Sequence, residues 1–430
     1  MTLTRSDCLA LDATDRLAAH RASFALPEGV IYLDGNSLGA LPRATAARLA
    51  QVVDVEWGEG LIRSWNAAGW IDAPRRVGAK IAALIGARDD EVICADSTSI
   101  NLFKVLACAL RLQRAQPQVP VGARRVILSE RGNFPTDLYM AQGLIDLVGA
   151  DHELMLVEPH EIAPTVDALG PQLSVLMLTH VNFQTGAMHD MAALTAQAQQ
   201  HGALALWDLA HSAGAVPVDL DAARADFAVG CGYKYLNGGP GAPAFVFAAQ
   251  RHLGRLAADP FAQPLSGWLG HRAPFAFDPG YAPATGIERF AVGTPSILAL
   301  AALDCGVDTV RAAGIDALRA KSVALSDLFI RLVDQRCDGF DLALVTPRDP
   351  ARRGSQVGYA HPQAWPVMQA LIAADPAVIG DFRAPDILRF GFAPLYVRFV
   401  DVWDAVEALR EILASGRHRE ARYQARQAVT

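Results

Sequence analysis

The chain has 430 residues, of which 52% are hydrophobic and 19% are charged, so it can bury a large core and we expect about two or three domains. A net charge of −7 gives no global support to nucleic-acid binding. No apolar run reaches the roughly 18 residues of a membrane span, and the polar N-terminus lacks the apolar stretch of a secretory signal. We therefore predict a cytoplasmic protein that binds neither nucleic acid nor membrane.

Six cysteines are spread along the chain without a C-x-x-C pair or a Cys/His cluster of zinc spacing. They are Cys8, Cys94, Cys108, Cys231, Cys305 and Cys337. This pattern predicts reduced, mostly buried thiols in a reducing compartment and no metal site.

Short apolar runs alternate with helix-like stretches over the first 300 residues. The predicted strands cover 30–33, 91–94, 125–128, 154–157, 174–178, 203–206, 227–229 and 244–247, and the predicted helices cover 100–113, 137–148 and 192–201. Several runs are continuously apolar, which is typical of strands buried on both faces. The repeated strand-helix-strand order predicts an α/β fold with a mainly parallel sheet covered by helices.

The C-terminal part has a different pattern. It predicts long helices over 296–313 and 315–337, strands near 342–345, 356–359 and 387–390, and a last helix over about 400–417. These elements indicate a smaller α+β domain. We predict an N-terminal segment (1–45) packed near the small domain and the active site, a large domain (46–300) and a small C-terminal domain (301–430).

Lys234 and Asp208 are the most informative residues, because each ends an apolar run and they lie 26 residues apart, about one strand-helix-strand unit. In a parallel sheet such a unit places both residues at the edge where open α/β folds bind ligands. A lysine can form a Schiff base with an aldehyde cofactor, and a carboxylate can hold the proton of a pyridine nitrogen. Alone, Lys234 would be a surface residue at a strand end and Asp208 a helix cap. The pair predicts a pyridoxal-type site.

Residues around this pair fit the same cofactor, although each also has a structural interpretation. His211 could stack near a ring or donate to a phosphate, or it could be a structural histidine. Tyr233 could bind a phosphate or relay protons, or pack as a core aromatic. Ser97 and Thr98 precede a predicted helix, where hydroxyls and free N–H groups bind anions and also cap the helix.

The segment 35–39 matches G-x-S-x-G, the form of a hydrolase nucleophile elbow centred on Ser37. An elbow places its serine at a sharp strand-to-helix turn, whereas here Pro42 follows and the helical pattern begins only near Arg43. A turn or binding segment is therefore favoured. Trp268 lies in a loop rich in Gly and Pro, which indicates a ligand contact or a subunit interface.

A series of motifs in order along residues 5–415 resembles the kynureninase family. The motifs are D-G-N-S-L-G (34–39), N-F-P-T-D (133–137), D-L-A-H-S-A-G (208–214), Y-K-Y-L-N-G-G-P-G (233–241), S-G-W-L-G-H (266–271), G-T-P-S-I (293–297) and R-F-G-F-A-P-L-Y (389–396). The resemblance implies a fold-type I pyridoxal 5'-phosphate enzyme of the aspartate aminotransferase superfamily. It implies hydrolysis of L-kynurenine to anthranilate and L-alanine by Cβ–Cγ cleavage, in the tryptophan catabolism (kynurenine) pathway that leads to NAD biosynthesis.

The resemblance also implies roles for particular residues and a homodimer whose active sites lie at the subunit interface. The catalytic residues would be Lys234, Tyr233 and Asp208, and the cofactor would also contact Ser97, Thr98, Phe134, Asp137, Thr179, His211, Trp268 and Thr294, the last two from the neighbouring subunit. Arg389 would bind the substrate α-carboxylate, and Trp65 and Ser37 its aryl end. Thr294 and Trp65 differ from the Asn and His of members that prefer 3-hydroxykynurenine, so plain kynurenine is the favoured substrate.

Three alternatives remain at the level of the sequence. A cysteine desulfurase or aminotransferase of the same fold would share Lys234 and Asp208, and the desulfurase would need a mobile reactive cysteine. A serine hydrolase would depend on Ser37. A non-catalytic protein would bind the cofactor without turnover.

Overall fold

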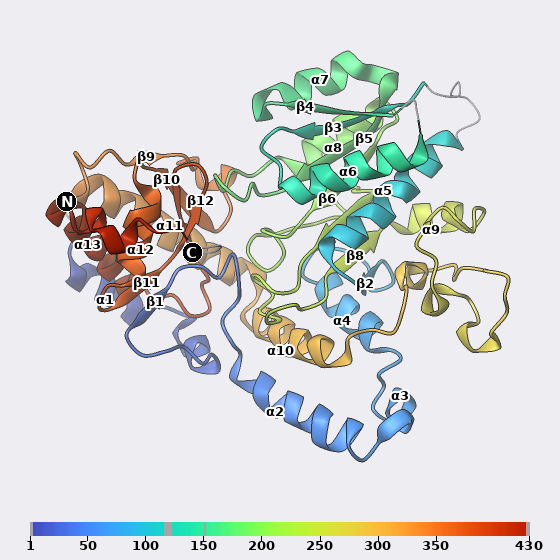
Figure 1. Ribbon diagram of the computed structural model, residues 1–430, viewed down its shortest axis with the longest axis horizontal. Coiled ribbons are helices and arrows are strands. Elements are labelled where there is room, and N and C mark those ends of the chain that lie inside the picture. The colour runs from blue at the N-terminus through green and yellow to red at the C-terminus, as the bar shows by residue number, and fades with distance from the viewer. Residues whose placement is uncertain (1–2, 116–122, 150–151, 427–430) are drawn as a thin grey trace.

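The computed structural model describes residues 3–115, 123–149 and 152–426. Met1, Thr2 and residues 427–430, at the outer ends of the predicted N-terminal segment and small domain, lie outside the described residues. Figure 1 shows a large sheet covered by helices and, beside it, a smaller group of helices and strands at which both chain ends lie. In the part of the chain that is described, no helix is long and apolar enough to cross a membrane.

The large sheet has seven strands in the order β2-β8-β7-β6-β5-β3-β4. They are β2 (Val92–Cys94), β3 (Val126–Glu130), β4 (Glu153–Val157), β5 (Leu173–Thr179), β6 (Leu204–Asp208), β7 (Phe227–Gly230) and β8 (Phe245–Ala248). From β7 to β4 all neighbours are parallel, which confirms the predicted mainly parallel sheet. β8 is antiparallel to both neighbours, because a loop without a crossover helix leads to it from β7.

Helices cover both faces of this sheet. They are α4 (Ala73–Ala82), α5 (Thr98–Arg114), α6 (Pro135–Val148), α7 (Ile162–Leu169), α8 (Met191–Gln200), α9 (Gln250–Leu256) and α10 (Ile297–Ala313). Successive residues of the fully buried β5 enter different hydrophobic clusters: Val175 packs with residues of α5 and α6, and Leu176 with residues of α7 and α8. This two-sided burial is the reason for the continuously apolar sequence of β5.

The small domain contains a four-stranded antiparallel sheet in the order β12-β13-β10-β9. Its elements are α11 (Ile315–Arg336), β9 (Ala343–Leu344), β10 (Gln356–Ala360), α12 (Ala364–Ile372), β12 (Asp381–Arg383), β13 (Ile387–Gly391) and α13 (Phe399–Ser415). The three predicted strands of this region are confirmed, whereas β12 was not predicted. β12 matters for the site because its register places Asp381 directly opposite Arg389.

The N-terminal segment joins the small domain. Helix α1 (Arg5–Ala13) packs against α13, and β1 (Val30–Tyr32) pairs in parallel with β11 (Ala377–Ile379). The strand predicted at 30–33 therefore exists but belongs to a separate two-stranded sheet. The predicted boundaries at 45 and 300 fall inside α2 (Arg43–Gln51) and α10, which pack against each other, and the domain division stays a prediction.

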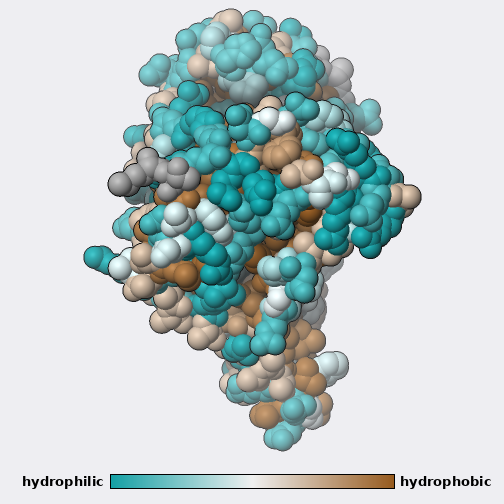
Figure 2. Space-filling model, turned by 90° about the vertical axis from the view of Figure 1, so that its left-hand side faces the viewer, coloured by the Kyte–Doolittle hydropathy of each residue, from teal (hydrophilic) through white to brown (hydrophobic). Residues whose placement is uncertain are grey.

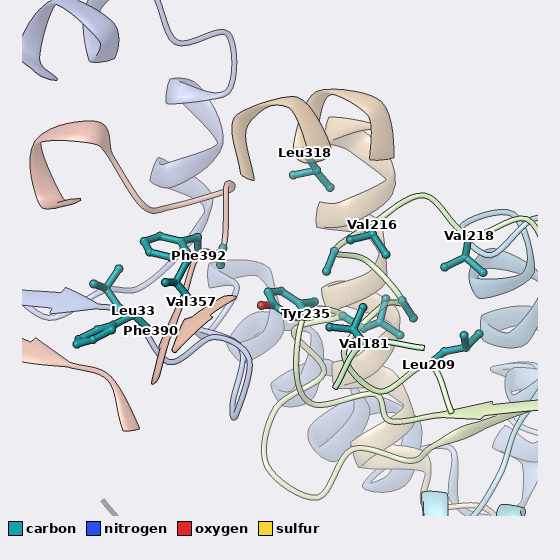
Figure 3. Packing of buried hydrophobic residues seen from close by; sticks show 14 of the residues in the cluster. Leu33, Val181, Leu209, Val216, Val218, Tyr235, Leu318, Val357, Phe390 and Phe392 are labelled. Carbon is teal, nitrogen blue, oxygen red and sulfur yellow. The ribbon is translucent and has the colours of Figure 1, made fainter. Parts of the chain in front are cut away.

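A continuous hydrophobic cluster connects the two domains beside the predicted lysine. In Figure 3, Tyr235 lies between Phe392 and Val357 of the small domain and Val181 of the large domain. The Tyr235 hydroxyl donates a hydrogen bond to the Ser355 carbonyl (3.0 Å). The loop that carries Lys234 is thus fixed against both domains.

Candidate active site

A cavity of about 360 Å³ lies at the carboxyl ends of strands β5, β6 and β7, where open α/β sheets bind ligands. It brings together nine residues that the sequence predicted for the cofactor: Ser97, Thr98, Phe134, Asp137, Thr179, Asp208, His211, Tyr233 and Lys234. They come from the ends of different strands and from the first turns of α5 and α6. The parallel order of the sheet is what makes these distant residues converge.

Lys234 differs from the other lysines in its surroundings. The chain has four lysines, and Lys80, Lys104 and Lys321 each form an ion pair with a carboxylate. The Nζ atom of Lys234 instead lies 2.9 Å from Nε2 of His211 and 5.9 Å from the ring centroid of Phe134. Its amine is therefore available to a ligand in the cavity.

Two buried carboxylates face the cavity from the opposite side. Burial raises the pKa of Asp208, against the opposing effects of Lys234 and of the Ala210 N–H, which donates to the carboxylate at 2.8 Å. Burial and the charge of Asp208 raise the pKa of Asp137 well above its usual value. Neither carboxylate forms an ion pair with a residue in the described ranges. A protonated pyridine nitrogen would supply the missing cation, so this end of the cavity fits the predicted cofactor.

Asn133 organises this side of the cavity and was not predicted as a site residue. Its Oδ1 accepts hydrogen bonds from the Thr179 hydroxyl and from the Phe134 N–H (2.7 Å). Thr179 also lies 3.5 Å from Asp137. Asn133 thus fixes three predicted cofactor contacts, and its place in the N-F-P-T-D motif was the signal that could have identified it.

The first turn of α5 lines one end of the cavity. Ser97 caps the helix by accepting the Ile100 N–H (3.4 Å), and Thr98 and Ser99 also line the cavity. Asp96 precedes the cap with a left-handed backbone (φ +45°) and forms an ion pair with the buried Lys104. The capping interpretation is therefore confirmed. The free N–H groups and the dipole of a 17-residue helix favour an anion at this end, and phosphate binding stays a prediction.

His211 and Tyr233 have protonation states that suit a proton-transfer site. Burial, followed by the charge of Lys234, lowers the pKa of His211 well below its usual value, so its imidazole is neutral. Its Nδ1 atom is buried and forms no direct hydrogen bond of good geometry within the described part of the chain, and Gln356 is the polar side chain that acts on the ring. Burial raises the pKa of Tyr233, so this hydroxyl keeps its proton.

Arg389 and Ser37 lie outside this cavity, in a second group that we call the arginine cluster: Asp34, Ser37, Asp381, Arg383 and Arg389. Nε and Nη2 of Arg389 donate to the two oxygens of Asp381, with 2.8 Å for the Nε bond. Ser37 Oγ lies 2.7 Å from Arg389 Nη2 and donates to Asp381 (2.9 Å). Asp34, Asp381 and Arg383 were not predicted, because their role depends on a strand register and on contacts across the whole chain.

The arrangement of Ser37 does not resemble a hydrolase nucleophile. Its hydroxyl binds a carboxylate and two arginines, and the turn that carries it follows β1 without an elbow helix. Gly39 closes this turn against the lysine loop: its N–H donates to the Tyr233 carbonyl (2.7 Å), and a Cβ there would lie 2.5 Å from the Lys234 carbonyl oxygen. The segment 34–39 is thus a connection between the two binding regions.

The structure does not bring the remaining three predicted residues into the cavity. Trp65 packs edge-on against Trp70, with ring centroids 6.2 Å apart. Trp268 is exposed and packs edge-on against Phe275. Thr294 is exposed on a neighbouring cavity that shares Asp96 with the first one.

All six cysteines are free thiols, five buried and Cys305 half-buried, which confirms the prediction of reduced, mostly buried thiols. Burial raises the pKa of every one of them. A reactive cysteine needs a lowered pKa and an accessible position. None of these thiols therefore suits the persulfide chemistry of a desulfurase.

Solved structures share this fold at low sequence identity. A cysteine desulfurase from Thermococcus onnurineus aligns over 92% of this chain and 98% of its own, with a TM-score of 0.74 and 20% identity. The C-DES mutant K223A, solved with glycine covalently linked to its pyridoxal phosphate, aligns over the same shares with a TM-score of 0.74 and 16% identity. These likenesses show that the chain has the fold of these structures, one of which holds pyridoxal phosphate, and the cavity residues fit such a cofactor.

Sequence comparison gives the family. Kynureninase of Burkholderia mallei is 58% identical over 99% of this chain and its own full length, and kynureninase of Pseudomonas fluorescens is 56% identical over the same shares. The family model of the kynureninase C-terminal domain matches residues 318–409. The chain belongs to the kynureninase family.

Proposed function

We propose that this protein hydrolyses L-kynurenine to anthranilate and L-alanine with pyridoxal 5'-phosphate as its cofactor, in tryptophan catabolism. One observation carries the proposal: Lys234 and the buried Asp208 line the same cavity. Among the described residues, Lys234 forms no ion pair with a carboxylate and lies beside His211 instead. We expect the 3-hydroxy form to be a poorer substrate. The absence of a membrane-spanning helix from the described residues is compatible with a cytoplasmic location, which we also propose.

The cavity residues would divide the work of holding the cofactor. Lys234 would bind its aldehyde covalently, Asp208 would hold the proton of its ring nitrogen, and Phe134 would cover its ring. The N-terminus of α5, with Ser97 and Thr98, would bind its phosphate. When bound, the cofactor supplies an aldehyde that takes up the substrate amine and a ring that accepts electrons from the reacting carbon.

Proton transfers would fall to Lys234 and Tyr233. With the cofactor and substrate bound, the Lys234 amine would take the proton of the substrate α-carbon. The neutral His211, 2.9 Å away, accepts a hydrogen bond from this amine and keeps it oriented. Tyr233 keeps its proton and can donate it while water adds to the side-chain carbonyl and the Cβ–Cγ bond breaks. Kynurenine and one water give anthranilate and alanine.

We further propose a homodimer that completes each active site with Trp268 and Thr294 of the neighbouring chain. The arm formed by α2, the segment 52–63 and α3 (Ser64–Ala67) extends from the lower side of Figure 1. It exposes large apolar side chains, with Ile62 78% exposed, and the lower extension of the surface in Figure 2 carries hydrophobic residues among hydrophilic ones. Exposed apolar surface of this kind favours a subunit interface. Sedimentation should give twice the chain mass of 45.9 kDa, and a monomer would contradict the proposal.

The function is tested by assaying the purified protein, with and without added pyridoxal phosphate, for anthranilate formed from kynurenine. Lys234→Ala should abolish both the visible absorbance of the bound cofactor and turnover, a loss of at least about 10³-fold. Lys80→Ala is the matched control, because Lys80 pairs with Asp304 and Asp308 away from the cavity. Retention of absorbance and turnover by the Lys234 variant would sink the proposal.

A further inference from the structure

Four of the five N–H groups of the Arg389 guanidinium already donate hydrogen bonds to described residues. It is 1% exposed, its Nε and Nη2 bind Asp381, and its Nη1 donates to the Phe183 carbonyl (2.6 Å). Ser37 takes a further position on Nη2 (2.7 Å). The edge formed by Nε and Nη2 is held by Asp381 and Ser37, so a substrate carboxylate can reach Arg389 only through Nη1 or by displacing Ser37.

Arg383 is the second arginine of the cluster and has donors to spare. Its hydrogen bonds to described residues all come from Nη2, which reaches Asp381 (2.6 Å) and Ser37 (3.2 Å). Its Nε is buried and has no acceptor anywhere in the described ranges. The side chain is 34% exposed, whereas that of Arg389 is 1% exposed, so Arg383 is the arginine that a ligand can reach.

The position of Arg383 links the cluster to the cofactor cavity. Its charge contributes to the lowered pKa of His211, and it opposes the raised pKa of Tyr233. The Oγ of Ser37 lies within hydrogen-bonding distance of Nη2 of both arginines, which marks a position for one oxygen between two cations. A planar carboxylate binds best to such a pair of guanidinium groups.

The balance of charge in the cluster also favours an anion. Asp381 and Asp34 face the two arginines, but burial and the charge of Asp381 raise the pKa of Asp34 to about 7. Near neutral pH the cluster therefore carries excess positive charge. Asp381 is the carboxylate that forms ion pairs with both guanidinium groups and holds them side by side.

We propose that Arg383 is a substrate-binding residue that receives the α-carboxylate together with Arg389, while Asp381 positions both arginines. The proposal rests on the proposed function, because it assigns the carboxylate of the same substrate. Arg383 supplies the accessible donors, and Arg389 supplies the rigid cation behind them.

The test compares two ligands that differ only in the carboxylate, with the cofactor-loaded enzyme. Arg383→Gln should raise KM for kynurenine about 10- to 100-fold, with a smaller effect on kcat, because it removes charge-assisted hydrogen bonds. The inhibition constant of kynuramine, the amine that lacks this carboxylate, should stay unchanged. Arg383→Lys should lie between wild type and Arg383→Gln, because lysine keeps the charge but not the planar fork.

Arg336→Gln is the matched control, since Arg336 is also a partly exposed arginine of the small domain in an ion pair, with Glu407. It should leave both constants unchanged. The cofactor absorbance and melting temperature of each variant verify its folding, and if Arg383→Gln does not load with cofactor, Arg383→Lys carries the comparison. An unchanged KM, or an equal loss for kynurenine and kynuramine, would overturn the proposal.

The outcome is distinguishable from a failure of the proposed function. If the wild-type protein forms no anthranilate, that function is wrong. Binding of kynurenine and kynuramine can then be followed through the absorbance of the cofactor. The role of Arg383 would be overturned as well if the wild-type protein did not bind kynurenine more tightly than kynuramine. It would also be overturned if Arg383→Gln preferred kynurenine over kynuramine as strongly as the wild-type protein does.

Discussion

The cofactor cavity and the arginine cluster are two binding regions built in opposite ways. The cavity collects side chains from the ends of neighbouring parallel strands of one sheet. The arginine cluster joins a turn after β1 to two strands of the small domain, and its bond between Ser37 and Asp381 spans 344 residues of sequence. The first region is a property of one domain, and the second exists only where the two domains and the N-terminal segment meet.

The difference also concerns charge. In the cavity, burial raises the pKa of two carboxylates that form no ion pair with a described residue, although the charge of Lys234 acts on both, so a ligand cation would find a partner there. In the cluster, two arginines share the buried Asp381, so each arginine already has a carboxylate partner within the protein although the cluster keeps excess positive charge. Changes in the cavity should therefore affect chemistry, whereas changes in the cluster should affect substrate affinity and stability.

The largest effect is expected from Asp208→Asn. The amide cannot hold a proton on the ring nitrogen, so kcat should fall at least about 100-fold, with an altered absorbance of the bound cofactor. Asp190→Asn is the control, because Asp190 caps α8 and asparagine caps equally well. Steady-state kinetics and the absorbance spectrum measure the effect. An unchanged kcat in Asp208→Asn would show that the cavity does not affect the chemical step, and the difference between the cavity and the arginine cluster would then be wrong.

A smaller effect on catalysis, but a larger one on stability, is expected from Asp381→Asn. This substitution leaves Arg383 and Arg389 without their shared carboxylate. Breaking a buried ion pair lowers the free energy of unfolding by about 3 kcal/mol. KM for kynurenine should rise more than kcat falls. Denaturant unfolding measures the loss of stability, and steady-state kinetics measure KM and kcat. A fall in kcat with an unchanged KM would show that Asp381 acts in the chemical step and not in substrate binding.

The smallest effect is a pH dependence of stability that comes from Asp34. Its pKa is raised from 3.8 to about 7 in the folded protein, so between these values the unfolded chain loses a proton that the folded protein keeps. Stability therefore falls as the pH rises from 4 to 7 and levels off above 7. Asp34→Asn lacks this loss, so its melting temperature relative to wild type should rise by roughly 5 °C over that window. A constant difference from pH 4 to 8 would show that Asp34 does not titrate there.

The sequence predicted the cavity well because local patterns carry the necessary information. Apolar runs locate the strands, and a parallel sheet brings their carboxyl ends together, so Lys234 and Asp208 could be paired from their spacing. Asn133 was not predicted as a site residue although its motif was recognised. An asparagine in the loop between a strand and a helix can have many roles, and only its hydrogen-bond partners in the structure show which role it has.

What the sequence determined by itself is which residues gather at the ends of the large-domain strands, since this follows from the order of strands and helices along the chain. Only the tertiary structure decided the arginine cluster, the pairing of β1 with β11 and the position of Ser37 between two arginines. The physical reason is that β12 is three residues long and its register depends on packing between distant segments. No local pattern encodes which carboxylate will hold a buried arginine.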